Sequence, residues 1–445
     1  MTAVRRMRLG LFGMLPGHHL GAWRDPDARP DAATSLADYL AAAQLAERGL
    51  FDFVFLADSL GLSEREATSG SFSRHFAELE PIPVLAALAA ATRRIGLVAT
   101  ASTSFNEPYH VARSFATVDL MSDGRAGWNA VTSYVDAAAR NFGLDVSPEP
   151  AARYRRAEEF IDIVRQLWDS MRAGVLVLDT AADRFFDPSK VRSIDHGGEH
   201  FRVRGPLNVP PSAQGRPVVV QSGSSPEGMR LGARTAEVVF TAQSVLADGR
   251  LFAERMREEM GAFGRGPSEL LIMPGLMPVV RETRSEAEDA FARMQDLVPD
   301  APALEMLSTI LGGKALSGYD PAGPLPAFDP AEISGRGSRS RQAVVIEQAR
   351  EQGLTLRDTA KRAAASRGHL LVVGTAADVA DVMQEWFEEG AADGFNVMPP
   401  VLPRELAAFV SQVVPELQRR GLFRTAYAHA TLRANLGLPG SPPPA

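Results

Sequence analysis

The stretch RIGLVATASTSFNEPYHVARSFATVDLMSDGRAGWNAVTS, residues 94–133, contains the pattern that decides the fold. It opens with a short apolar run at 94–100, continues with an amphipathic segment that begins at Pro108, and ends with a second short run at 124–133. Proline favours the first turn of a helix, and both apolar runs have the length of buried strands. The stretch therefore predicts a strand–helix–strand unit of a parallel sheet.

The same alternation continues along most of the chain. Eight strands are predicted, within RLGLFGML (8–15), FDFVFLAD (51–58), RIGLVAT (94–100), GRAGWNAVTS (124–133), PVVVQSG (217–223), EVVFTAQ (237–243), LLIMPGLMPVV (270–280) and DGFNVMPP (393–400). Helical stretches separate them, with no internal repeat and no inter-domain linker. This pattern favours a single α/β domain, residues 1–445, folded as a (β/α)8 TIM barrel with insertions. A doubly wound open sheet is the alternative.

Two long stretches interrupt the alternation. The first, at about 174–215, is rich in turn residues, and the second, at about 300–368, has a mixed character. A long connection in a compact barrel is more often functional than a spacer. The second insertion is therefore a candidate lid, with residues 317–326 as the part that would close.

The composition excludes several kinds of chemistry. The chain has no cysteine, which removes disulfides, thiolate metal sites and a cysteine nucleophile. Its 54 acidic and 47 basic residues give a net charge of -7, with no long basic stripe, so nucleic acid is not an expected partner. The one basic cluster, residues 334–342, is interpreted either as a solvated loop or as an attractant for an anionic ligand.

The beginning of the chain favours a cytoplasmic location. The segment MTAVRRMRLGLFGML has a short apolar stretch and no small-residue cleavage site, and is interpreted as a first strand. No apolar run is long enough to cross a membrane, so no membrane partner is expected.

Polar residues near the carboxyl ends of the predicted strands are candidate site residues, because chemistry in such barrels takes place at that end. This rule selects Asp58, Thr100, Ser102, Thr103, Ser104, Asn129, Ser222 to Ser225 and Asn396. Asp58 could equally be the cap of the following turn.

The stretch QSGSSPEG, residues 221–228, predicts an anion seat. If Pro226 is the first helical residue, Ser225 is the cap, and the free backbone amides of the first turn lie beside the hydroxyls of Ser224 and Ser225. Such a helix start suits a phosphate. An ordinary helix cap without a ligand is the other interpretation.

Metal and nucleotide motifs are not found in the sequence. His196 and His200 are four residues apart but lie in IDHGGEH, which is not helical, so no metal site is predicted. There is no Walker sequence and no G-x-G-x-x-G after the first strand.

Several longer motifs together resemble a known family. They are GHHLGAWR, ERGLFDFVFLAD, SFSRHFAELEPIPVLAALAAATRRIGLVATASTSFNEPYHVAR, GRAGWNAVTS, RGPLNVPPSAQGRPVVVQSGSS, VVFTAQ, VGTAADVAD, DGFNVMPP and TLRANLGL. On these motifs the chain is identified as a member of the bacterial-luciferase-like flavin monooxygenases, in the branch of nitrilotriacetate, dibenzothiophene-sulfone and long-chain alkane monooxygenases. The resemblance covers nearly the whole chain.

The resemblance implies the cofactor and the partners. It implies a barrel that uses reduced FMN, supplied by a separate NAD(P)H-dependent flavin reductase, and O2 to transfer one oxygen atom to a small organic substrate. It also implies a homodimer or homotetramer. The flavin contacts implied are Asp58, Thr103, Ser104, Asn129, Tyr154, Ser224 and Ser225, the last two at the phosphate.

Histidines and one departure from the family pattern complete the candidate site. His18, His19 and His75 are the titratable groups expected near the barrel mouth, where one of them could accept or donate a proton during the reaction. Relatives often carry a histidine four residues before Tyr154, where this chain has Pro150, and Arg153 could supply the missing contact. An oxidoreductase that uses the deazaflavin F420 and a non-catalytic flavin-binding protein are the alternative functions.

Overall fold

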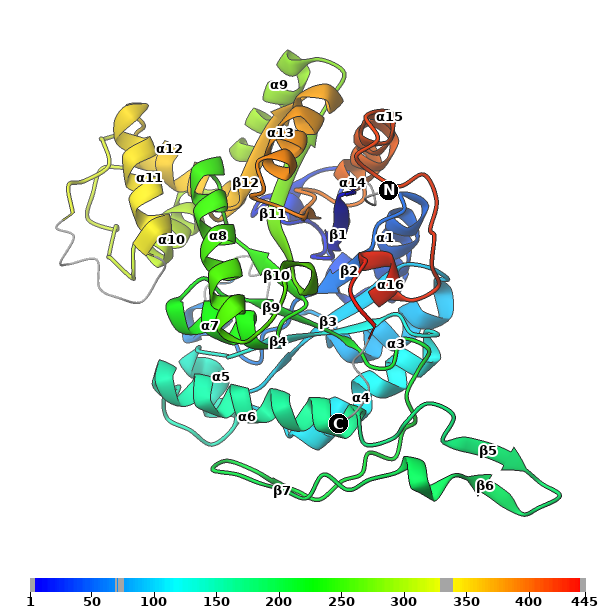
Figure 1. Ribbon diagram of the computed structural model, residues 1–445. Coiled ribbons are helices and arrows are strands. Elements are labelled where there is room, and N and C mark those ends of the chain that lie inside the picture. The colour runs from blue at the N-terminus through cyan, green and yellow to red at the C-terminus, as the bar shows by residue number, and fades with distance from the viewer. Residues whose placement is uncertain (1–4, 69, 71–75, 329–338, 441–445) are drawn as a thin grey trace.

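Eight parallel strands form a closed ring in the computed structural model, which describes residues 5–68, 70, 76–328 and 339–440 (Figure 1). The ring runs β1–β2–β3–β4–β9–β10–β11–β13 and closes where β13 pairs with β1. The eight strands are β1 (Arg8–Phe12), β2 (Phe53–Leu56), β3 (Gly96–Ser102), β4 (Ala126–Val131), β9 (Val218–Ser222), β10 (Val238–Thr241), β11 (Leu271–Val280) and β13 (Gly394–Val397). The predicted TIM barrel is confirmed, and the open sheet is wrong because a closed ring has no edge strands.

A ninth strand, which the sequence pattern did not predict, extends the sheet beyond the ring. The strand β12 (Leu370–Gly374) pairs in parallel with residues 276–280, the carboxyl-terminal half of β11, whereas β10 pairs with residues 271–274. Leu276 is opposite both Leu370 of β12 and Val397 of β13. The start of β12 therefore lies level with the carboxyl end of the ring.

Helices surround the ring, as Figure 1 shows. Those that follow the ring strands are α1 (Leu36–Arg48), α3 (Pro81–Ala91), α4 (Pro108–Met121), α6 (Pro150–Trp168), α7 (Pro226–Thr235), α8 (Leu246–Ala262), α9 (Arg284–Asp296), and α14 (Arg404–Ala408), which continues through a π-helical turn (Phe409–Val413) into α15 (Val414–Arg419). Prolines at the first turns of α3, α4, α6 and α7 set the helical φ where no amide partner is needed. Helix α13 (Ala376–Glu388) follows β12, and α2 (Glu64–Thr68) and α5 (Asp136–Asn141) lie in loops. Within the described residues, every helix is too short or too polar to cross a membrane.

Side chains alternate between the inside and the outside of the ring, as a strand period of two requires. One core cluster, which includes Phe53, Val98, Val220 and Met273, fills the inside. The larger cluster lies between strands and helices, where Trp128 of β4 packs against aromatic rings of α4 and α6.

The first insertion forms two small hairpins. Strands β5 (Leu176–Asp179) and β6 (Arg184–Phe186) pair antiparallel, as do β7 (His196–Gly197) and β8 (Arg202–Val203). The β5–β6 hairpin projects from the rest of the molecule (Figure 1), and all of its residues are exposed.

The second insertion is helical, which the sequence analysis did not predict. It contains α10 (Asp300–Ile310), α11 (Arg339–Glu351) and α12 (Leu356–Ser366). Leu307, Leu356 and Ala360 belong to a separate small core here, and α10 packs against α12. Residues 334–338 of the basic cluster lie outside the described residues.

The amino end of the ring is closed by the C-terminal segment. Helix α16 (Leu432–Leu436) places Leu432 and Leu436 inside the barrel. A Cβ on Gly96, at the start of β3, would lie 2.4 Å from the Leu432 side chain, so only glycine fits there. The end that remains for a ligand is the carboxyl end.

Candidate active site at the carboxyl end of the barrel

Three phenylalanines form an aromatic floor inside the barrel. Phe12 ends β1, Phe55 lies in β2 and Phe240 lies in β10. Their ring centroids are 5.1 to 5.7 Å apart, and all three pairs are tilted. This apolar floor closes the barrel below its carboxyl end and can support a flat ring system.

Two histidines lie at the level of this floor. The His18 ring meets Phe12 edge-on at 5.4 Å, and the His369 ring stacks on Phe240 at 5.2 Å with an interplanar angle of 13°. The two imidazole centroids are 6.0 Å apart. A Cβ on Gly275 of β11 would lie 2.4 Å from His369 Nδ1, so the missing side chain makes room for this ring.

Two buried asparagines point amide oxygens without partners into the barrel. Asn129 of β4 donates from Nδ2 to Thr100 Oγ1 at 2.8 Å, but its Oδ1 accepts no hydrogen bond in the described structure. Oδ1 of Asn396, in β13, also lacks a described donor, and both residues are at most 2% exposed. Buried polar atoms are almost always satisfied, so these two are candidate contacts for a ligand that donates hydrogen bonds.

The helix start that was predicted as an anion seat has the expected cap geometry. Ser225 is the N-cap of α7, and its Oγ accepts a hydrogen bond from the Gly228 amide at 3.1 Å. Tyr154 of α6 brings its hydroxyl to 3.1 Å from Ser225 Oγ. Ser224 and Ser225 are exposed. Two hydroxyls from residues distant in the sequence therefore meet at a helix start, where the dipole favours a negative charge.

Thr103 and Ser104 follow β3 on the same side of the barrel. Thr103 is buried, and its hydroxyl donates to the Val131 carbonyl at 3.0 Å, which ties the end of β3 to β4. Ser104 is half-buried and lies 3.5 Å from the Ser133 carbonyl through its hydroxyl. Thr103 thus has a local partner, and Ser104 is the more accessible of the two.

Asp58 follows β2 and is half-buried. Burial, together with the nearby charge of Asp58, raises the pKa of Glu80 above its ordinary value. Two carboxyl groups therefore lie near each other on this part of the rim.

The remaining predicted residues differ in their surroundings. His19 is buried, accepts a hydrogen bond from the Gly21 amide at Nδ1, and contacts Gln295 Oε1 at 2.8 Å through Nε2. Burial lowers its pKa, so it is a neutral ring held by its neighbours. His75 lies outside the described residues. Pro150 is the first residue of α6.

Arg153 and the other histidine pair are also engaged. The Arg153 guanidinium donates to the Ser133 carbonyl at 3.2 Å. His196 Nε2 lies 2.9 Å from Glu159 Oε1. No group of three potential metal ligands occurs in the part of the chain that the structure describes.

The strand-end rule missed the aromatic floor and His369. The floor residues are apolar, so a search for polar strand ends could not select them. His369 comes before a strand that was not predicted. The signal that could have found Phe12 and Phe55 is their inward position in β1 and β2.

Comparison with known proteins places this site in a family. Residues 12–393 match the model of the luciferase-like monooxygenases. The chain is 47% identical to nitrilotriacetate monooxygenase component A of Aminobacter aminovorans and 45% identical to N-acetyl-S-(2-succino)cysteine monooxygenase of Bacillus subtilis, with 98% of each chain covered in both cases. The solved structure of EDTA monooxygenase from Chelativorans sp. BNC1 superposes with a TM-score of 0.82 at 33% identity, covering 99% of this chain and 100% of that one.

A parallel barrel with its polar groups at the carboxyl end is the architecture of an enzyme, and the relatives define its class as a monooxygenase. The chain belongs to the luciferase-like monooxygenase family. The family assignment made from the sequence motifs is confirmed.

Proposed function

We propose that the chain is the oxygenase of a two-component system, which uses reduced FMN and O2 to transfer one oxygen atom to a small organic substrate. The observation that carries this proposal is the hydroxyl pair of Tyr154 and Ser225 at the start of α7, 3.1 Å apart. This pair and Ser224 suit the FMN phosphate. The proposed flavin contacts also include Asp58, Thr103, Ser104 and Asn129.

The barrel interior suits the isoalloxazine ring. That ring is flat and carries both donors and acceptors along its pyrimidine edge. The aromatic floor offers a flat apolar surface, and Asn129 Oδ1 and Asn396 Oδ1 are acceptors that still lack donors. The residues therefore fit the cofactor at its phosphate end and at its ring end.

The chain's own contribution is to orient the substrate and exclude water, because reduced FMN, when bound, supplies the electrons that activate O2. The apolar floor helps to keep water from the reacting centre. Of the histidines predicted to assist, His18 faces the floor, whereas His19 is held by Gly21 and Gln295. We therefore propose the imidazole of His18 as the group that accepts or returns a proton.

The missing family histidine has a structural substitute in this proposal. Pro150 carries no side-chain donor, and Arg153 lies one turn further along α6. The Arg153 guanidinium approaches the end of β4 from that helix. It can add a donor near the phosphate seat.

Several partners belong to the proposal. A separate NAD(P)H-dependent flavin reductase is supported by the designation "component A" of the Aminobacter relative. A cytoplasmic location gives access to NAD(P)H. A homodimer or homotetramer is supported by the projecting β5–β6 hairpin, whose Leu178 and Phe185 side chains are 57% and 67% exposed. The helical insertion at 300–368 is proposed to act as the lid.

Reconstitution tests the function. The protein is mixed with a flavin reductase, NADH, FMN and 18O2, and a panel of organic acids, thioethers and alkanes is examined by mass spectrometry. The expected result is a product that carries one 18O atom and requires the reductase. Turnover by the protein with NADH but without a reductase would contradict the proposal.

A further inference from the structure

His369 is held at the joint between the second insertion and the barrel. Its backbone amide donates to the Ser366 carbonyl at 3.0 Å, at the end of α12, and β12 begins at the next residue. A Cβ on Gly275 of β11 would lie 2.4 Å from Nδ1 of His369 and 2.5 Å from Sδ of Met398. The glycine therefore leaves the space in which the imidazole reaches over β11 to the aromatic floor.

This imidazole and that of His18 form a pair on the aromatic floor, here called the histidine pair. Their ring centroids are 6.0 Å apart, and the two rings are nearly perpendicular, at 77°. His18 contacts Phe12, and His369 stacks on Phe240. Two imidazoles from distant parts of the chain therefore meet where the flavin ring is proposed to lie.

The histidine pair lies across the barrel from the proposed phosphate seat. The seat at Ser225 follows β9, and His18 follows β1. In the ring of eight strands, β1 and β9 are four positions apart, on opposite sides of the barrel. The ribityl chain of FMN separates the phosphate from the ring, so a flavin seated at Ser225 extends its ring toward the histidine pair.

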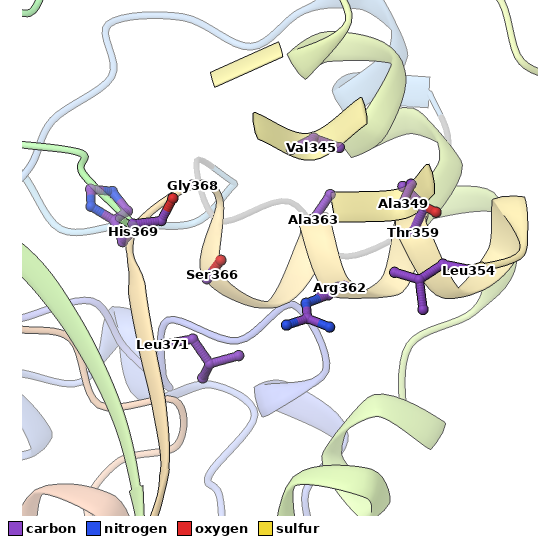
Figure 2. A pocket seen from close by; sticks show the side chains of 11 residues that line it. Val345, Ala349, Leu354, Thr359, Arg362, Ala363, Ser366, Gly368, His369 and Leu371 are labelled. Carbon is purple, nitrogen blue, oxygen red and sulfur yellow. The ribbon is translucent and has the colours of Figure 1, made fainter. Parts of the chain in front are cut away.

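The two members of the pair differ in their access to water. His18 is 2% exposed, whereas His369 is half-buried and lines a cavity of about 130 Å³ (Figure 2). The other described polar side chains in the cavity lining are those of Ser244, Thr359, Arg362 and Ser366. A polar cavity of this size can hold water molecules, and water at this place can deliver a proton to His369.

Positive charges next to the histidine pair favour its neutral form. Arg367 donates to the His18 carbonyl at 3.0 Å, and Arg362 lines the cavity together with His369. The neighbouring His19 is neutral, because burial lowers its pKa. A nearby cation disfavours a protonated imidazole, whereas an anion favours it. Two protonated rings at this separation would also repel each other, so the pair is expected to hold at most about one proton.

We propose that the histidine pair takes up a proton when reduced FMN binds, and that this proton balances the negative charge of the reduced ring. The inference rests on the proposed function and deepens it by assigning His369 to the flavin site. The reduced ring is an anion near neutral pH, whereas the oxidised ring is uncharged, so only the reduced form draws the proton. One proton moves from water to one imidazole, and no electron is transferred in this step.

The proton makes the affinity for reduced FMN depend on pH. Because binding takes up a proton, the affinity falls as the pH rises, by up to about tenfold for each pH unit while a full proton is taken up. Oxidised FMN has the same phosphate but no charge on its ring. Its affinity should therefore stay constant over the same range, so the pair makes the site selective for the reduced cofactor.

Calorimetry tests this inference by counting protons. Reduced and oxidised FMN are titrated anaerobically into the protein at pH 8, in HEPES and in Tris, which differ in ionisation enthalpy. At this pH an imidazole in water is mostly neutral, and the FMN phosphate is almost fully ionised. The difference in binding enthalpy between the two buffers gives the number of protons taken up. An uptake of up to about one proton is expected for reduced FMN, and none for oxidised FMN.

Variants assign the proton to the histidine pair. His369→Phe keeps an aromatic ring for the stack on Phe240 but removes the titrating nitrogens, so it should lower the proton uptake and flatten the pH dependence. His369→Gln, which removes the ring, should do the same. Combining either with His18→Gln should abolish the uptake. His196→Gln removes an imidazole that pairs with Glu159 outside the site, and is expected to leave the uptake unchanged. Melting temperatures show which variants are folded.

Three results would overturn the inference. Reduced FMN could bind the wild-type protein at pH 8 without proton uptake, or the uptake could be unchanged in both His369 variants. An equal uptake with oxidised FMN would instead assign the proton to the phosphate seat. Absence of saturable binding of reduced FMN contradicts the proposed function itself, and this failure is recognised because no titration curve is obtained.

Discussion

The two ends of the barrel treat buried polar groups in opposite ways. At the amino end, Arg433 of α16 forms a two-pronged ion pair with Glu237, with distances of 2.5 and 3.1 Å, and Arg424 pairs with Asp52. At the carboxyl end, the buried amide oxygens of Asn129 and Asn396 lack partners among the described residues.

This difference indicates that buried polar groups have a structural role at the amino end and a binding role at the carboxyl end. The amino end is closed by C-terminal residues, and its charges are satisfied within the chain, so they hold the barrel together. At the carboxyl end, polar atoms remain available for the ligands of the proposed function. Substitutions at the amino end should therefore change the free energy of unfolding, and those at the carboxyl end should change binding.

The largest effect is expected at the amino end. Arg433→Met would leave Glu237, which is 7% exposed, without its partner. Breaking a buried pair costs about 3–5 kcal/mol, so the free energy of unfolding by urea should fall by that amount. Arg250→Met, which breaks an exposed pair with Glu389, should cost less than about 1 kcal/mol. Equal losses in the two variants would contradict the comparison.

A smaller effect should appear as a pH dependence. Burial, opposed by hydrogen bonds from Ser212, Ala126 and Gln214, raises the pKa of Asp119 to about 6. The folded state then binds more protons than the unfolded state between about pH 4 and 6, so the contribution of this group to stability is lost as the pH rises through that window.

The size of this loss is on the order of 2–3 kcal/mol for a shift of about two pKa units. Asp119→Asn removes the titrating group. The difference in unfolding free energy between the variant and the wild type should therefore change across pH 4 to 6 and stay constant above pH 7. A difference that is independent of pH would contradict the raised pKa.

Helix caps at the two ends provide a matched pair. Ser225→Ala and Thr431→Ala each remove an N-cap hydroxyl, from α7 and α16 respectively, which costs about 1 kcal/mol of stability. Only Ser225→Ala is expected to weaken the binding of reduced FMN, with a dissociation constant about tenfold higher, or roughly 1.4 kcal/mol. Anaerobic fluorescence titration measures this. A similar loss of affinity in Thr431→Ala would mean that the effect is structural.

The smallest change in stability is expected for Arg367→Met. The Arg367 side chain is 6% exposed, donates a hydrogen bond to the His18 carbonyl, and has no carboxylate partner among the described residues. The unfolding free energy of the variant should therefore change by less than about 1 kcal/mol. A loss of 3–5 kcal/mol, as expected for Arg433→Met, would show that Arg367 has a structural anionic partner.

The ring and the N-cap of α7 could be predicted from the sequence because both depend on local pattern. Each ring strand is a short apolar run next to a helix, and the cap of α7 is set by Ser225 followed by Pro226. The family resemblance named Tyr154 and Ser225 as separate flavin contacts, and the structure places their hydroxyls 3.1 Å apart.

The parts of the fold and site that were not predicted depend on contacts between residues that are distant in the sequence. The helices of the second insertion are stabilised by their own small core, and β12 is defined by its pairing with the far half of β11. The position of His369 depends on Gly275, almost 100 residues away in the sequence. No local pattern contains this information.

Anaerobic titration of the wild-type protein with reduced FMN, followed by mixing with oxygenated buffer, tests the central claim most directly. The claim is that the open carboxyl end is the reduced-flavin site. Saturable binding and a reoxidation rate that differs from that of free reduced FMN are expected, with weaker binding in Ser225→Ala and unchanged binding in Thr431→Ala. Absence of saturable binding, or reoxidation at the rate of free flavin, would contradict it.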